Sequence, residues 1–254
     1  MNRFRKALVR KPGMNFHAGL TSSQLGVPDY ALTLRQHHDY CSALVKCGLD
    51  LFILDPNEQY PDSPFVEDTC VLTARSAIIT RPGHISRRGE EEEIAAFFRN
   101  HRMLRRITEP GTIDGGDVLQ VNDRFFIGLS GRSNKEGVRQ MEQILKEEGY
   151  TADVVELKNY LHLKAAVNYL GDETLIMHEH FEAGTPFNHY NIIRVSDRES
   201  YAANCLRIND TILVPEGFPE TLEKIKKLNI PVLELQVSEF RKMDGGLTCL
   251  SLRF

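Results

Sequence analysis

The sequence has 254 residues, of which 41% are hydrophobic and 26% charged, with a formal net charge of −4 at pH 7. This composition is that of an ordinary globular protein and excludes a disordered or collagen-like chain. The slightly acidic balance provides no basic surface for nucleic acid. An apolar run near the N-terminus stops at Arg10, which is too short for a signal peptide or a membrane span. We therefore expect a cytoplasmic protein that binds neither nucleic acid nor a membrane.

The five cysteines are odd in number and lack the paired spacing of a zinc site, which argues against a disulfide framework or a zinc ribbon. Cys249 follows a glycine-rich acidic turn at residues 243–248 and is a candidate nucleophile, although a lone cysteine in an apolar segment is more often a small buried hydrophobe. We interpret the other four as packing residues: Cys41, Cys47, Cys70 and Cys205.

Four helices are predicted along the chain. The first spans residues 29–45, and the second spans 90–98 and begins with acidic residues, which are favourable at a helix N-terminus. The third opens with a capping box at residues 133–136 and stops at Gly149. The fourth covers residues 219–229, where apolar residues recur at helical spacing.

Between these helices, five segments share one pattern: an apolar, strand-like run has a polar residue near its start, and a turn leads to a second apolar run. The polar residues recur at intervals of 42 to 48 residues, which indicates a repeat architecture. They are Asp68, Asp114, His162, Asn204 and Cys249. The last segment lacks its second run, which the strand-like residues 6–10 could supply by closing a ring. We therefore predict a single α/β domain over residues 1–254, a propeller of five units of strands plus a helix, although another α/β protein could show a similar rhythm.

Residues at equivalent positions of such a ring meet near its axis. The ring would therefore bring the Cys249 thiol and the His162 imidazole together with the carboxylates of Asp68 and Asp114. A thiol with an imidazole is a nucleophile with an acid/base, whereas carboxylates select a cation. A guanidinium fits this set, because it is planar, stays protonated and offers its N–H donors in a fork. The residues favour covalent cysteine chemistry on a cationic substrate.

Other interpretations of these residues stay open. His162 stands between two leucines and could be a core histidine bonded to a backbone carbonyl. Asp114 stands beside two glycines and could be a turn residue, and we interpret Asp117 and Asp244 as structural. Residues 178–180, His-Glu-His, resemble a metal-ligand doublet, but no third ligand stands at a recognisable spacing. We therefore predict a surface loop there and no metal site.

Seven motifs resemble those of dimethylarginine dimethylaminohydrolases, in the same order and spacing: residues 61–68, 81–83, 86–88, 111–117, 161–164, 202–205 and 244–249. The match runs from Leu20 to the C-terminus. The resemblance implies the five-bladed pentein fold of the guanidine-modifying enzymes. It also implies hydrolysis of asymmetric dimethylarginine, and of monomethylarginine, to citrulline and a methylamine, without a metal or organic cofactor.

At the matching positions, the resemblance implies that Cys249 is the nucleophile, His162 the acid/base and Asp114 the carboxylate that orients it. Some members carry Glu at this last position, so whether the shorter Asp114 also touches the substrate stays open. The resemblance places the guanidinium on Asp68, with Glu67 as its neighbour.

The rest of the substrate is placed in the same way. Phe65 is expected to pack beside its stem. Its α-carboxylate is expected to bind Arg87 and Arg132, which, without the resemblance, we would interpret as solvated surface charges.

The α-amino group of the substrate is expected on Asp62, together with backbone carbonyls near Leu20 and Met243. Residues 19–23 would then form a mobile lid over the pocket. These assignments describe a site for a free amino acid, with its two charged ends and its side chain each bound.

Several rival functions can be compared with this one. Arginine deiminases and amidinotransferases of the same fold are longer, and this chain has no spare segment for an inserted helical domain. A papain-like protease has its cysteine before its histidine, the reverse of the order here. A non-catalytic binding module of this fold would lack the thiol or the imidazole. A monomer and a homodimer are both compatible with the sequence.

Overall fold

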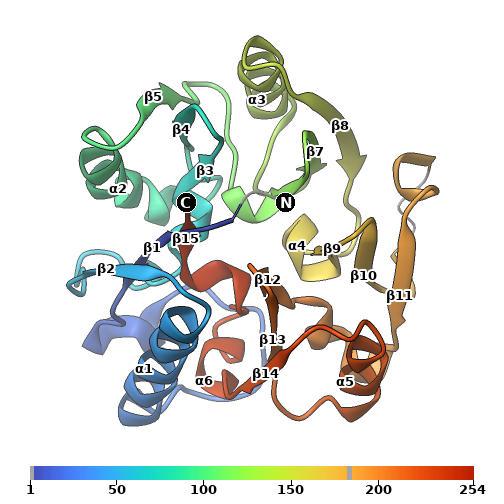
Figure 1. The fold of residues 1–254 in the computed structure, drawn as a ribbon. Coiled ribbons are helices and arrows are strands. Elements are labelled where there is room, and N and C mark those ends of the chain that lie inside the picture. The colour runs from blue at the N-terminus through green and yellow to red at the C-terminus, as the bar shows by residue number, and fades with distance from the viewer. Residues whose placement is uncertain (1–2, 182–184) are drawn as a thin grey trace.

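The computed structural model describes residues 3–181 and 185–254, which form five sheets of three strands in a ring around a central axis (Figure 1). In every sheet the first two strands pair antiparallel and the third pairs parallel to the second. The predicted five-unit α/β propeller is confirmed. Each unit has three strands, whereas the sequence pattern predicted two. The third strand was missed because it is mostly half-buried or exposed and lacks a long apolar run.

Four units are continuous in the sequence. Their strands are β3 (Cys70–Leu72), β4 (Ser76–Ile79) and β5 (Met103–Arg106); β6 (Val118–Val121), β7 (Arg124–Leu129) and β8 (Thr151–Glu156); β9 (Val167–Gly171), β10 (Thr174–His178) and β11 (Asn191–Val195); and β12 (Leu206–Ile208), β13 (Thr211–Pro215) and β14 (Val232–Leu235). The fifth unit joins the two ends of the chain: β15 (Leu252–Arg253), β1 (Lys6–Arg10) and β2 (Asp50–Leu54). Leu8 of β1 pairs with Leu252 of β15, so the predicted closure of the ring is confirmed.

Helices at the rim of the ring connect the second strand of a unit to the third, because parallel strands need a long crossover (Figure 1). They are α1 (Tyr30–Lys46), α2 (Glu90–Phe98), α3 (Lys135–Glu147) and α5 (Pro219–Lys226). All four predicted helices are therefore confirmed. In the third unit, the described residues between β10 and β11 contain only the short helix η5 (Thr185–Phe187), so the prediction of a helix in every unit is wrong there.

A short helical turn precedes the first strand of each unit: η2 (Val66–Thr69), η4 (Gly115–Asp117), α4 (Leu163–Ala166), η6 (Asp197–Ala203) and η7 (Thr248–Leu250). The five periodic polar residues lie in or directly beside these turns, not at the start of a strand as predicted. The turns contact one another around the axis, η2 with η4 and η7, and α4 with η4 and η6. This packing brings the polar side chains together.

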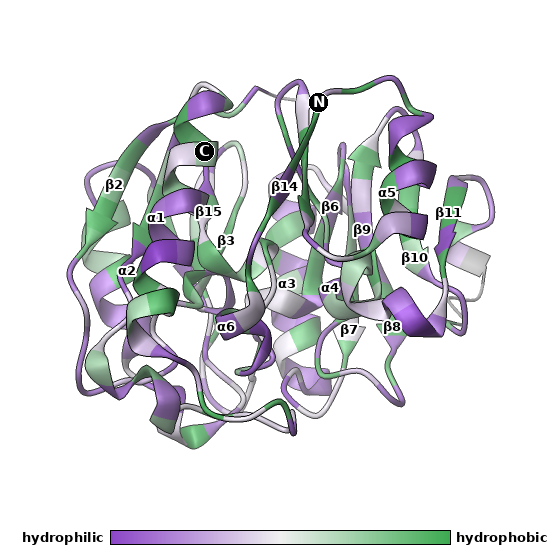
Figure 2. Ribbon diagram, turned by 90° about the horizontal axis from the view of Figure 1, so that it is seen from below, coloured by the Kyte–Doolittle hydropathy of each residue, from purple (hydrophilic) through white to green (hydrophobic). Residues whose placement is uncertain are grey.

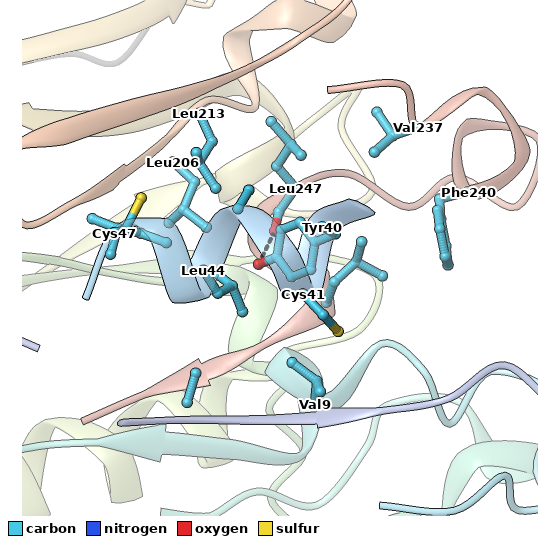
Figure 3. Close-up of a cluster of buried hydrophobic side chains, with 14 of the residues drawn as sticks. Val9, Tyr40, Cys41, Leu44, Cys47, Leu206, Leu213, Val237, Phe240 and Leu247 are labelled. Carbon is cyan, nitrogen blue, oxygen red and sulfur yellow. Dashed lines mark hydrogen bonds between the residues drawn. The ribbon is translucent and has the colours of Figure 1, made fainter. Parts of the chain in front are cut away.

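Apolar side chains fill the space between the sheets and the rim helices. Strands such as β7 and β10 are mainly hydrophobic, whereas α1 and α2 also carry hydrophilic residues (Figure 2). In the cluster of Figure 3, Leu44 of α1 packs with Leu247, and the Tyr40 hydroxyl donates to the Leu247 carbonyl at 2.9 Å. The same hydroxyl is 2.7 Å from the Ser251 hydroxyl. Helix α1 is thereby tied to the segment that carries Cys249.

Two further predictions concern burial and membranes. The four cysteines interpreted as packing residues are buried: Cys41, Cys47, Cys70 and Cys205. Among the described residues, none of the helices combines the length and the apolar character that crossing a membrane requires.

The remaining short helices lie in the loops between the strands. They are η1 (Met14–Ala18), η3 (Ile85–Arg87) and α6 (Ser238–Arg241).

Candidate active site

A cavity of about 240 Å³ lies where the loops ahead of the first strands meet. Of the predicted substrate-binding residues, only Glu67 is outside its lining. His84 and Leu161, which sequence analysis did not single out, also line it. The predicted site residues in the lining are Leu20, Asp62, Phe65, Asp68, Arg87, Arg132, His162, Met243 and Cys249.

His162 lies directly before α4 and is buried between carboxylates. Its Nε2 is 3.0 Å from Asp114 Oδ2, and its Nδ1 is 3.9 Å from Asp68 Oδ1. Burial by itself lowers the pKa of the imidazole, but the Asp68 charge and the hydrogen bond to Asp114 outweigh it and raise the pKa to about 9. The ring therefore carries a proton at neutral pH. Gly116 permits this packing, because a Cβ there would lie 2.7 Å from His162 Nδ1.

Asp114 contacts the imidazole from behind and does not line the cavity itself. It is fully buried, and its Oδ1 accepts a hydrogen bond from the Gly83 N–H at 2.8 Å. Its Oδ2 faces His162, and Arg132 Nη1 lies 3.7 Å from the same oxygen. The backbone bond and the imidazole bond together hold the carboxylate in a position to orient the ring.

Asp68 presents a carboxylate to the cavity from η2. Its Oδ1 accepts the Gly116 N–H at 2.9 Å, and its Oδ2 accepts from Arg87 Nη1. Burial would raise the pKa of this carboxyl, but the charges of His162 and Arg87 lower it to about 2. Asp68 is therefore ionised at neutral pH and can accept from a cationic ligand, because each carboxylate oxygen has two lone pairs.

Arg87 lines the cavity, but its guanidinium is already held by two carboxylates. Besides the contact with Asp68, its Nη2 lies 2.8 Å from Glu90 Oε2. Sequence analysis missed Glu90, whose pKa burial raises to about 7 against the opposing charge of Arg87. The spacing of three residues from Arg87 to the first residue of α2 was the available signal.

Cys249 lies within η7, directly after the glycine turn. Its Sγ accepts from the Gly246 N–H at 3.4 Å. Burial, together with the charges of Glu67 and Asp68, raises the pKa of the thiol to about 12. In the protein alone the thiol is therefore neutral, beside a protonated imidazole. Gly245 allows the turn to pack on Phe65, whose ring a Cβ at this position would meet at 2.2 Å.

Glu67 extends away from this cavity although it neighbours Asp68. Its Oε1 is 2.7 Å from Lys164 Nζ and 3.4 Å from Arg253 Nη2, and its Oε2 accepts from the Thr248 hydroxyl at 2.7 Å. It lines a second cavity, of about 620 Å³, which the first strands surround. Glu67 thus forms an ion pair between the two cavities instead of contributing to the wall of the first.

Asp62 and the predicted lid form another part of the lining. Asp62 is buried, which raises its pKa, and the Leu20 N–H lies 3.0 and 3.1 Å from its two oxygens. Ser22 donates to Asp244 Oδ2 from its N–H at 2.5 Å and from its hydroxyl at 2.9 Å. Residues 19–23 are thereby held against the loop that follows α6.

Two groups of described residues offer ligand atoms within 4.8 Å of one another: Asp68, Asp114 and His162, and Glu179, His180 and Asp197. The first group is part of the cavity site and suits a cation. For the second, the sequence shows no third ligand at a recognisable spacing, and the fold brings Asp197 beside Glu179 and His180. Glu179, His180 and Asp197 are exposed, so the predicted surface loop is confirmed for Glu179 and His180, but it is wrong for His178, which ends β10 and is buried.

Comparisons with known proteins match the whole chain. A sequence model of the arginine deiminase family matches residues 50–206. The chain is 46% identical to N(G),N(G)-dimethylarginine dimethylaminohydrolase of Pseudomonas aeruginosa, over 99% of this chain and 100% of that protein. It is 36% identical to the protein of the same name from Streptomyces coelicolor, over 98% and 96%. A solved structure of a cysteine-to-serine variant of the Pseudomonas protein with citrulline matches with a TM-score of 0.98, 45% identity and full coverage of both chains.

Proposed function

The chain belongs to the family of dimethylarginine dimethylaminohydrolases, and from this premise we propose that it hydrolyses asymmetric dimethylarginine to citrulline and dimethylamine, with Cys249 as the nucleophile. Monomethylarginine would give citrulline and methylamine. The observation that carries the proposal is the presence of the Cys249 thiol, the His162 imidazole and the ionised Asp68 in the lining of one cavity. The complex of the Pseudomonas variant with citrulline, the expected product, supports it.

The cavity offers a binding group for each part of the substrate. The guanidinium would lie on Asp68, and the stem would pack on Phe65, which is buried beside it. The α-carboxylate would bind Arg132, which lines the cavity and lies 3.7 Å from Asp114, more readily than Arg87, which is held closely by the carboxylates of Asp68 and Glu90. The α-amino group would bind Asp62.

Substrate binding would activate the thiol. The pKa of Cys249 is high in the protein alone because the site is buried and negatively charged. A bound guanidinium supplies positive charge next to the sulfur, which favours the thiolate. The proton leaves to solvent, since His162 already carries its own. The enzyme thus forms its nucleophile only when the cation that it attacks is present.

The reaction would then proceed in two displacements. The thiolate adds to the central guanidinium carbon, and His162 gives its Nδ1 proton to the dimethylamine nitrogen as that C–N bond breaks. A thiouronium remains on Cys249. The neutral imidazole then removes one proton from water, which adds to the same carbon, and the C–S bond breaks to release citrulline. The second proton of the water passes to the departing sulfur and restores the Cys249 thiol. Asp114 holds His162 through Nε2 in both steps, and the second ring nitrogen stays free for proton transfer.

The methylated nitrogen of the substrate would be recognised on the side of the site away from Asp68. Methylation removes N–H donors from one guanidinium nitrogen but keeps the charge. The methylated nitrogen would therefore point away from Asp68, toward the leaving-group side. The unmethylated nitrogens keep the donors that Asp68 accepts.

We further propose that the whole chain acts as one catalytic domain, as a monomer or a homodimer, without a metal or organic cofactor, because side chains and water supply every step above. Five free cysteines, one of them the nucleophile, suit the reducing cytoplasm. The oligomeric state can be checked by the mass of the purified protein in solution, and the independence from a metal by turnover in the presence of a chelator.

The decisive experiment incubates the purified protein separately with asymmetric dimethylarginine and with arginine, and follows citrulline, dimethylamine and ammonia. Cys249→Ser is expected to lose at least about 10³-fold in kcat. Cys47→Ala is the matched control, because this cysteine is buried in the cluster under α1 and does not line the cavity. Ammonia from arginine would identify a small deiminase, and no turnover of either compound would refute the proposal.

A further inference from the structure

Asp117 ends η4 and lies behind the His162–Asp114 pair. It is fully buried and does not line the cavity. Its Oδ1 accepts the Leu163 N–H at 2.9 Å, and its Oδ2 accepts the hydroxyls of Ser130 and Ser133, both at 2.6 Å. Three hydrogen bonds from two separate segments, the loop between β7 and α3 and the start of α4, therefore converge on one carboxylate.

The directions of these bonds indicate the charge of Asp117. The Ser130 hydroxyl oxygen already accepts the N–H groups of Arg132 and Ser133, and the Ser133 hydroxyl oxygen accepts the Asp114 N–H at 3.2 Å. Each hydroxyl proton is then left to donate to Asp117. Since all three partners donate, the carboxylate acts only as an acceptor, which is its ionised form.

This buried charge has no salt-bridge partner among the described residues. The titratable groups that face it are Asp114 from its own loop and His162 from the segment before α4, and burial raises the pKa of Asp117 itself. His162 in turn faces Asp68 from η2 and Asp114, with Arg132 near Asp114 on the far side. The imidazolium is the cation that the Asp117 charge stabilises, and Asp117 in turn raises the pKa of His162.

Asp117 is also joined to both partners through the backbone. Leu163, whose N–H it accepts, directly follows His162 in the chain. Ser133 links it to the Asp114 N–H. Ser133 was expected to begin the capping box of α3, but the Asn134 side chain caps that helix by accepting the Gly137 N–H at 2.8 Å. The Ser133 hydroxyl is thereby available to bridge the two aspartates.

We propose that Asp117 is a positioning residue for the hydrolysis, which rests on the function proposed above: it holds the segments of His162 and Asp114 in place and supplies a fixed negative charge behind the imidazole that donates the proton. It touches no substrate, so its removal should change kcat much more than KM. The structural interpretation from sequence, a turn residue beside two glycines, predicts lower stability but no change in the pH dependence.

The test compares the wild type with Asp117→Asn, which keeps the size of the side chain and removes its charge. The pH dependence of kcat and the NMR titration of the His162 ring are measured for both. In the variant, the His162 pKa should fall by about one unit, and kcat at neutral pH should fall roughly tenfold. The His162 titration needs no turnover, so it tests the proposal separately from the activity of the wild type on dimethylarginine.

A folded Asp117→Asn protein with an unchanged His162 titration and pH profile would overturn the proposal. If that variant does not fold, the double variant Ser130→Ala/Ser133→Ala takes its place. It leaves Asp117 in position but removes both hydroxyl donors, so burial should protonate the carboxyl and shift the His162 titration in the same direction. An unchanged titration there would equally count against it. Ser130→Ala alone leaves the link to Asp114 and should show a smaller shift.

Discussion

The site has two halves, one around His162 and one around Cys249, and they are built from different chemistry. The imidazole half contains buried carboxylates, with Asp114 and Asp68 nearest to the ring. In the thiol half, the residue before Cys249 is held by a neutral amide: Asn204 Oδ1 accepts the Thr248 N–H at 3.0 Å. The amide group of Asn204 donates to the Thr248 hydroxyl and to the Lys164 carbonyl, both at 3.0 Å.

The two halves differ in what their surroundings control: the protonation of His162 in one and the position of the Cys249 sulfur in the other. Charges around His162 determine its protonation, because they hold its pKa at about 9. The hydrogen bonds of Asn204 help to fix where the Cys249 sulfur lies but bring it no positive charge, while burial and the charges of Glu67 and Asp68 raise the pKa of the thiol to about 12. Under the proposed function, the missing positive charge would come with the substrate, and the thiol would stay neutral until a guanidinium binds.

The largest expected effect comes from breaking the charged half. Asp114→Asn removes the acceptor that orients His162 and one of its negative neighbours. We expect kcat to fall by about 10²- to 10⁴-fold, the usual contribution of a positioned acid/base, and the His162 pKa to fall as well. The pH dependence of kcat and an NMR titration of the ring check both changes. Asp210→Asn is the control, since this carboxylate is largely exposed and far from the cavity lining, and it should leave both unchanged.

A second prediction tests whether the thiol half lacks positive charge. Because the thiol pKa lies near 12, the thiolate fraction of Cys249 should increase about tenfold for each pH unit from 7 to 9, about 100-fold in all. The rate of alkylation by iodoacetamide, followed by mass spectrometry of the Cys249 peptide, should rise accordingly. A plateau in this range would mean a thiolate already formed without substrate. An unreactive alkylguanidinium that leaves the sulfur accessible should raise the rate at pH 7.

The smallest effect is expected from breaking the neutral half. Asn204→Ala leaves the buried Thr248 N–H and the Lys164 carbonyl with one partner fewer, which costs about 1–3 kcal/mol of stability. We expect kcat to fall roughly tenfold while the pH profile keeps its shape, because no charge is lost. Asn168→Ala is the matched control: Asn168 donates to the same Lys164 carbonyl at 2.7 Å and makes no contact with Thr248. A shifted pH profile in Asn204→Ala would contradict the division between the halves.

Much of the site could be predicted from the residues that recur along the chain. Asp68, His162 and Cys249 all line one cavity, as their spacing in a ring of five units implies. The predictions for two neighbouring residues show the limit of sequence analysis. Glu67 and Asp68 are adjacent and both buried, yet they face different cavities. In a 3₁₀ turn such as η2, successive side chains point about 120° apart, and which one faces the cavity depends on how η2 packs against η4 and η7.

Residue roles that depend on several segments at once could also not be predicted from the sequence. Ser130 and Ser133 belong to the loop after β7, whereas Leu163 begins α4, and only the fold directs both segments toward Asp117. The same holds for Asp197, which the ring brings beside residues 178–180.

The sequence by itself determined the five repeated units, the N-terminal strand that completes the ring, and the thiol and imidazole of the site, because periodicity and residue chemistry are local properties of the chain. The tertiary structure decided which way each buried charge faces. A carboxylate can be buried only where donors from other segments meet it, and those donors are brought together by packing between units. Asp68 is directed to the substrate cavity, Glu67 to the ion pair with Lys164, and Asp117 to the back of the imidazole for this reason.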